Sequence, residues 1–152
     1  DRDMSKSKSI ALAVCLSTIA FSASAAELVI TASNANEKSS SGQVALDIAT
    51  EGNVSGFNFV VKLPAGLKSG LVDVSNCLAD LPKGFSGDCR QGPEGVYVFA
   101  MANDQSTLPS GVTSLGRLVL PAALAKSELV IDQLVFADAK GETVQSTYQV
   151  AR

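Results

Sequence analysis

Short runs rich in Val, Ile, Leu, Phe and Thr recur along the chain from Ala26 onward, each closed by Gly, Pro, Asn, Asp or Ser. Runs of this kind at about ten-residue spacing, without helical periodicity between them, are typical of strands in an all-β sandwich. The most helix-friendly stretch, Pro121–Lys126, is too short to hold a helix alone and is predicted to be a turn. We therefore predict a single two-sheet antiparallel β-sandwich of jelly-roll type with about eight or nine strands. The predicted strands are Glu27–Thr31, Gln43–Thr50, Val54–Leu63, Leu71–Ser75, Gly95–Ala102, Ser114–Leu120, Ser127–Ala137 and Thr143–Val150.

Alternation along these runs predicts which side chains face the core. In Gln43–Thr50 the residues Val44, Leu46 and Ile48 share one face, as a half-buried strand requires. Phe57, Phe59, Val61 and Leu63 share one face of the next run, where Gly56 suggests a bulge or a close approach of another backbone. The polar stretch Ser33–Gly42 is predicted to be a loop between the first two strands.

The run Gly95–Ala102 is apolar on both faces, which predicts a central strand of its sheet. Tyr97, Phe99 and Met101 alternate there with Val96, Val98 and Ala100. We expect most of the aromatic side chains to belong to the core, with Tyr148 and Phe85 as the candidates for exposure.

Residues 1–25 are predicted to be an export signal, and residues 26–152 the mature domain. Lys6 and Lys8 precede an apolar run from Ile10 to Phe21, and Ala23-Ser24-Ala25 supplies a small-x-small cleavage site before Ala26. Met4 is the expected initiator, so the three residues before it are not part of the fold. The apolar run is shorter than a membrane-spanning helix, so the mature protein is expected to be secreted or periplasmic.

Export changes what the two cysteines of the mature chain imply. Cys77 and Cys89 flank a Gly- and Pro-containing segment, and an oxidising compartment favours a disulfide between them over a redox pair or a metal site. By the chain-entropy model, closing a loop of that size is worth about 3 kcal/mol.

The composition excludes several classes of chemistry. The sequence contains no His, so histidine general bases, Ser-His-Asp triads and imidazole metal sites are excluded. Its acidic residues are scattered singly, without a carboxylate-pair motif, so we expect no enzymatic activity and no cofactor. Calcium is the alternative that stays open, through oxygen ligands on loops near Asp104, Asp132, Asp138 and Glu142. The simpler interpretation of Ala137–Glu142 is a hairpin turn with Gly141 at a positive-φ position.

Charge and aromatic content bear on possible partners. The formal net charge is −3, and no basic cluster with interleaved aromatic residues is present, so neither nucleic acid nor a membrane surface is an expected partner. Sugar-binding modules usually present exposed aromatic platforms, often Trp, and this chain has no Trp.

Three stretches of the mature chain resemble the cohesin family, whose members are secreted jelly-roll β-sandwiches related in shape to bacterial carbohydrate-binding modules. The opening strands of the family are similar to Gly42–Ile48 followed by Val54–Pro64, and the next step to Leu67–Ser75. Its later strands and closing hairpin resemble Ser110–Leu120, Leu129–Phe136 and Asp138–Val144. The segment between the two cysteines departs from the family pattern, and no partner-contacting residue can be matched position by position.

The resemblance implies a non-catalytic secreted recognition module that binds a dockerin-like protein partner through a sheet face. This is a fold-level analogy. The alternative is a carbohydrate-binding module acting on cell-surface or extracellular polysaccharide. A third hypothesis is a structural subunit that associates with itself through a sheet edge.

Overall fold

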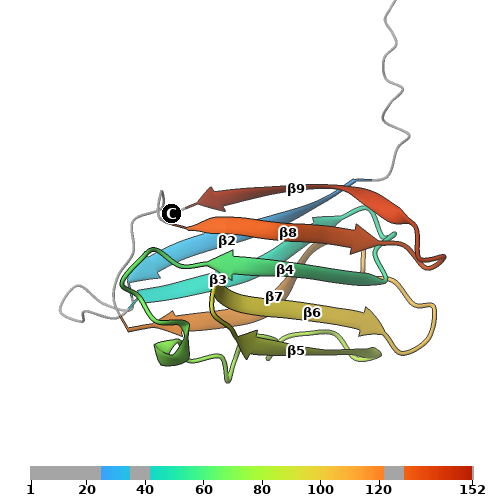
Figure 1. Ribbon diagram of the computed structural model, residues 1–152. Helices are drawn as coiled ribbons and strands as arrows, with labels where there is room; N and C mark the ends of the chain where they lie inside the picture. The colour runs from blue at the N-terminus through green and yellow to red at the C-terminus, as the bar shows by residue number, and fades with distance from the viewer. Residues whose placement is uncertain (1–24, 35–41, 122–128, 152) are drawn as a thin grey trace, which may run out of the picture.

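The computed structural model describes residues 25–34, 42–121 and 129–151, and these form an all-β sandwich (Figure 1). In the described residues the only helical element is a short 3-10 turn at Ser69–Leu71, and none is a helix long and apolar enough to cross a membrane. The predicted turn at Pro121–Lys126 and loop at Ser33–Gly42 lie largely outside the described residues. The strands are β2 (Ala25–Asn34), β3 (Gly42–Thr50), β4 (Gly56–Lys62), β5 (Phe85–Gln91), β6 (Gly95–Ala102), β7 (Gly111–Leu120), β8 (Val130–Ala137) and β9 (Thr143–Ala151).

The eight strands follow one another in the order β5-β6-β4-β8-β9-β2-β3-β7, and this continuous sheet curls into two layers. The first layer is β5-β6-β4-β8 and the second is β9-β2-β3-β7. The two layers join where β8 pairs with β9, through Phe136↔Val144 and Ala137↔Thr143. All neighbouring strands are antiparallel except β2 and β9, which are parallel. The jelly-roll β-sandwich predicted from the sequence is confirmed, with this one parallel pair added.

The core lies between the two layers and uses the faces that alternation predicts. Val44, Leu46 and Ile48 of β3 are fully buried. Phe59 and Val61 of β4 are at most 1% exposed. The Phe57 ring lies 6.1 Å from the Phe59 ring, centroid to centroid. Removing a core of this kind from water supplies most of the stabilising free energy of a small domain.

One segment closes the open side of the sandwich between β7 and β5. In this closing segment, residues 71–81, Asp73 and Val119 exchange backbone hydrogen bonds of 2.8 and 3.2 Å, and Arg117 donates to the Asn76 carbonyl at 2.8 Å. Cys77 joins Cys89 of β5 in a disulfide with a Cα–Cα distance of 6.4 Å. The predicted cysteine pair is therefore the bonded pair, and it ties the closing segment to the other layer.

The middle of the chain differs from the sequence-based prediction. Leu71–Ser75 is not a strand: it begins in the 3-10 turn and forms only an isolated bridge between Asp73 and Val119. In contrast, Phe85–Gln91 is a strand that the sequence did not reveal, because its polar residues and Gly87 show no apolar alternation. This strand depends on pairing with β6 and on the disulfide rather than on burial of its own side chains.

Candidate functional site

The outer face of the β5-β6-β4-β8 layer presents exposed apolar side chains at its centre. Phe99 and Met101 of β6 are 43% and 65% exposed, and Val135 of β8 is 38% exposed. Strand register places these residues in neighbouring rows that cross all four strands. The three successive rows are Ser86-Met101-Gly56-Ala137, Asp88-Phe99-Asn58-Val135 and Arg90-Tyr97-Val60-Asp132.

A hollow of about 240 Å³ lies in this face. Gly56 lies between Met101 and Ala137 in its row and has no side chain, so the surface is lower at that point. A Cβ atom at Gly56 would lie 3.5 Å from the Met101 Cβ and 3.4 Å from the Ala100 carbonyl oxygen, in ordinary van der Waals contact. Glycine at position 56 therefore leaves the middle of this row free of a side chain. The residues that line it are Gly56, Phe57, Asn58, Phe99, Ala100, Met101, Val135 and Ala137.

Polar groups surround this apolar centre. Arg90 Nε lies 3.1 Å from Asp88 Oδ2, and both side chains are largely exposed, so the pair adds little stability. Asn58 Nδ2 donates a 2.7 Å hydrogen bond to the Gln133 carbonyl, which fixes the amide beside the hollow. Ser86 Oγ donates to Asn103 Oδ1 at 2.6 Å. An apolar centre with a polar rim is the usual composition of a protein–protein interface.

The carboxylate of Asp88 is held in its charged form. The hydrogen bond from Arg90 and then the one from the Cys89 N–H lower the pKa of Asp88 below its usual 3.8. A lowered pKa in the folded state adds stability above the usual pKa of the carboxyl, and this contribution disappears as the pH falls through the lowered value. The ion pair at the edge of the face therefore persists at neutral and mildly acidic pH.

We predict that Arg90→Gln raises the pKa of Asp88 toward its ordinary value, because the substitution removes the largest cause of the shift. The pKa is measured by NMR titration of the Asp88 carboxyl carbon in the wild type and in the variant. Asp104, whose pKa is lowered by hydrogen bonds from Ser106, is the internal control and should titrate as before. An unchanged Asp88 titration in the variant would contradict the prediction.

The acidic residues considered for calcium do not form a cluster. Among the residues that the structure describes, no group of three or more His, Cys, Asp or Glu could hold a metal ion. Asp138 Oδ1 accepts hydrogen bonds of 2.9 Å from the Lys140 and Glu142 N–H groups, as in the hairpin turn that the sequence predicted. Asp104 Oδ1 similarly accepts the Ser106 N–H at 2.8 Å. These two loop carboxylates thus stabilise their own turns.

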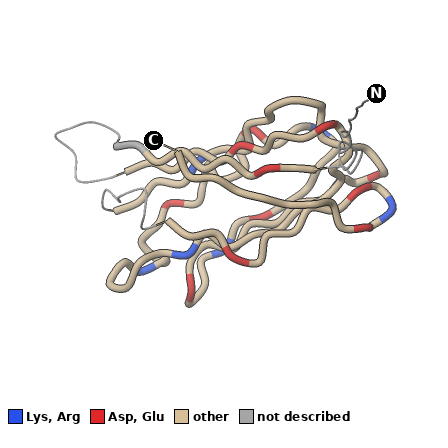
Figure 2. Tube along the Cα trace, turned by 90° about the horizontal axis from the view of Figure 1, so that it is seen from above, with Lys and Arg blue, Asp and Glu red and all other residues tan. Residues whose placement is uncertain are grey.

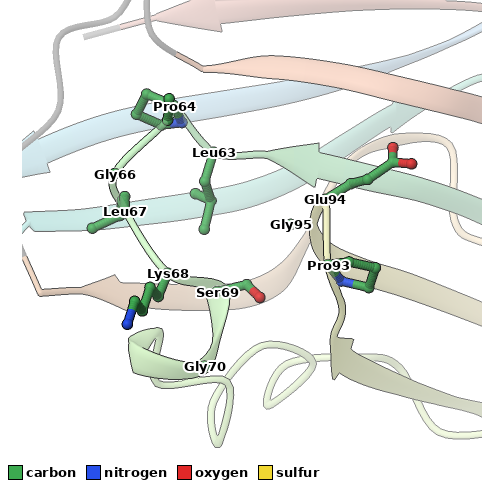
Figure 3. A pocket seen from close by; sticks show the side chains of 11 residues that line it. Leu63, Pro64, Gly66, Leu67, Lys68, Ser69, Gly70, Pro93, Glu94 and Gly95 are labelled. Carbon is green, nitrogen blue, oxygen red and sulfur yellow. The ribbon is translucent and has the colours of Figure 1, made fainter.

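A second hollow, of about 500 Å³, lies at the end of the same layer, between residues 63–70 and the Pro93–Gly95 turn. Figure 3 shows its two charged side chains, Lys68 and Glu94, at opposite ends of the space. Ser69 Oγ donates to the Gly92 carbonyl and so joins the two loops rather than pointing a free hydroxyl into the hollow. Exposed apolar side chains gather instead around Gly56, so that face is the better candidate site.

Exposure of Phe99 is the feature that sequence reasoning missed. Phe99 was expected in the core, but it is 43% exposed. Of the two aromatic residues expected to be exposed, Tyr148 is 41% exposed, whereas Phe85 is partly buried against the core. The available signal was the apolar character of both faces of Gly95–Ala102. Only one of those faces, with Val96, Val98 and Ala100, points into the sandwich.

No protein-family model and no curated protein matches this sequence. Solved structures do match the fold. A non-cellulosomal cohesin from the archaeon Archaeoglobus fulgidus superposes with a TM-score of 0.53 at 14% identity, over 84% of this chain and 91% of that chain. The chain has a cohesin-like fold. A type II cohesin from Bacteroides cellulosolvens gives a TM-score of 0.54 at 10% identity, over 80% of this chain and 94% of that one.

The cohesin-like fold confirms the resemblance on which the sequence analysis relied. The match extends over most of the chain. At these identities the likeness concerns the fold alone. The choice of a binding face in this cohesin-like domain therefore depends on its own exposed side chains.

Proposed function

We propose that this chain is a non-catalytic, exported recognition module that binds a protein partner through the outer face of β5-β6-β4-β8. The observation that carries the proposal is the hollow at Gly56, surrounded by exposed Phe99, Met101 and Val135. Contiguous exposed apolar side chains with a polar rim mark interaction sites in soluble proteins. A single apolar side chain of the partner would fill the hollow, as anchor residues do at the centres of interfaces.

The proposed partner is a dockerin-like protein, because the chain resembles the cohesin family. Flatness favours a protein over a small molecule, because the face lacks a deep pocket with converging titratable groups. Figure 2 shows acidic and basic residues interspersed along the described trace, and the acidic residues outnumber the basic ones in the sequence, which does not favour nucleic acid. Export is supported by the predicted signal in residues 1–25 and by the disulfide in the structure.

We predict that Phe99→Ala and Met101→Ala each weaken partner binding at least tenfold, which is about 1.4 kcal/mol or more. The partner is captured from the secreted proteins of the source organism on immobilised wild-type protein, identified, and then titrated by calorimetry. Gly56→Ala tests the hollow itself, because the added methyl group fits the backbone but occupies the space that the anchor needs.

Val112→Ala is the matched control. Val112 is 73% exposed on β7 in the other layer, so its truncation removes a comparable apolar side chain away from the proposed face. Circular dichroism melting verifies that each variant is folded. Retention of full affinity by the Phe99 and Met101 variants would contradict the proposed face. Retention of the protein on insoluble chitin or cellulose, with no protein partner captured, would favour the carbohydrate-binding alternative.

A further inference from the structure

Within the described residues, four strands have an edge that is not paired along its whole length: β5 and β7 at the ends of the sheet order, and β8 and β9 where the two layers join. An unpaired edge presents a row of N–H and C=O groups that another strand can pair with. Natural proteins usually block such edges with charges, bulges, proline or a covering segment.

Three of these edges are blocked in the described structure. The closing segment covers β7 through backbone hydrogen bonds to Arg117 and Val119. Strand β5 carries the charged pair Asp88 and Arg90 and is cross-linked through Cys89. Strand β8 is irregular, with a register shift opposite β4 and Gln133 in the left-handed region at φ 55°.

Strand β9 has none of these protections among the described residues. Its nine residues, Thr143–Ala151, contain no charged residue, proline or glycine and form no bulge with β2. Pairing with β8 ends at Val144, and from Gln145 onward the edge opposite β2 has no described strand beside it. Thr147, Tyr148 and Gln149 are all exposed. Figure 1 shows β9 at the rim of the sandwich.

Tyr148 further distinguishes the edge of β9 from the three blocked edges. It has the same alternation parity as Val144 and Val150, whose side chains point inward, and yet its side chain is 41% exposed because it lies at the open border beside β8. A large aromatic side chain left partly in water at an unblocked edge gains contact area when a further strand covers it.

We propose that β9 pairs with the β9 strand of a second copy of this chain, antiparallel across a two-fold axis, so that the β9-β2-β3-β7 layer continues into its partner. The sequence of the strand fits a second copy. Two-fold pairing sets Thr and Gln side chains of the outer face against each other, and no like charges meet because the strand has none. The inner-face Val, Ser and Tyr residues likewise meet one another.

The test is the association state of the purified protein, followed by sedimentation velocity over a wide range of concentration. The wild type is expected to form dimers reversibly. A pairing centred on the unpaired stretch Gln145–Ala151 places the axis at Tyr148. Gln149→Lys and Gln149→Glu should each weaken dimerisation at least about tenfold, because each places two like charges one residue from that axis. Mixing the two variants should restore association, since the opposite charges then face one another.

Val112→Lys is the matched control, because it adds the same charge at an exposed position of β7 and should leave the dimer unchanged. A wild type that stays monomeric throughout would overturn the proposal, and so would a dimer that Gln149→Lys leaves intact. Phe99→Ala lies on the other layer and should not affect the dimer, so failure of this proposal and failure of the proposed partner-binding face are distinguishable.

Discussion

Replacing Gly116 by alanine is expected to destabilise the folded protein by about 3 kcal/mol or more. Gly116 has φ 149°, a conformation that residues with a side chain rarely adopt, and it lies in β7 beside the bulge opposite Leu46 and Asp47. A Cβ atom there would overlap the Asn76 carbonyl oxygen and lie 2.5 Å from the Cys77 carbonyl oxygen. Both contacts are with backbone, which cannot rotate away as a flexible side chain can.

The close approach at Gly116 is what allows the closing segment to lie against β7. The Arg117 N–H reaches the Asn76 carbonyl at 2.8 Å, and the Asp80 N–H reaches the Leu115 carbonyl at 2.8 Å. An added methyl group would push the segment outward and break these bonds, leaving Leu115, now fully buried, less well covered. The expected loss thus combines backbone strain, steric overlap and lost hydrogen bonds.

Gly111→Ala separates the strain from the overlap. Gly111 begins the same strand at φ 106°, but no atom lies within 4 Å of the position that its Cβ would take. Its replacement should cost only the conformational penalty, about 1 kcal/mol. Urea denaturation of both variants measures the difference in the free energy of unfolding. Equal losses in the two variants would show that the contact with the closing segment does not stabilise the fold.

The sandwich could be predicted from the sequence because a half-buried strand shows an alternation of core-facing and outward-facing residues. The alternation of Val44, Leu46 and Ile48 with smaller and polar residues places one face inward, and the structure buries those three residues completely. The same logic fails for Gly95–Ala102, since both faces are apolar. Alternation then identifies two faces without saying which one faces the core. Phe99 and Met101 lie on the outer one.

The candidate site was not predictable for a second reason. Its hollow needs Gly56 of β4, Met101 of β6 and Ala137 of β8 in one row, and that row is created by pairing between strands far apart in the chain. No local pattern around Gly56 reports which side chains will stand beside it. The sequence suggested a bulge or close approach there, and the register shift with β8 occurs two residues later, between Asn58 and Val60.

Strand β5 shows the same dependence on distant contacts. Phe85–Gln91 lacks the apolar alternation of the other strands, and its Asp88 and Arg90 suit a loop as well as an edge. Pairing with β6 and the bond from Cys89 to Cys77 supply the order that the segment lacks by itself. The expected export and the presence of only two cysteines after residue 25 predicted the bond, but they did not indicate that one of the cysteines lies in a strand.

Removing the disulfide is expected to lower the free energy of unfolding by about 3 kcal/mol. The double variant Cys77→Ala/Cys89→Ala loses the covalent link between the closing segment and β5 without leaving one of the two bonded cysteines as a free thiol. Cys77 is 1% exposed, so its replacement also opens a small cavity beside the core. Thermal melting in oxidised and reduced buffer gives the measurement: reductant should lower the midpoint of the wild type and leave that of the double variant unchanged.

The loss should be uneven along the closing segment, because its two attachments differ in kind. The contacts with β7 are backbone hydrogen bonds that survive reduction. On the β5 side, the hydrogen bonds that remain come from the Gln91 side chain, whose Nε2 donates to the Val72 carbonyl at 2.7 Å and to the neighbouring Gly70 carbonyl at 3.3 Å. Hydrogen exchange of the reduced protein should therefore speed up in β5 more than at Val119. Equal acceleration at both places would mean that the disulfide supports the whole fold rather than the edge of the proposed binding face. Asp88 and Arg90 of β5 belong to the polar rim of that face. If β5 loses its order, this rim is therefore the first part of the face to be disturbed.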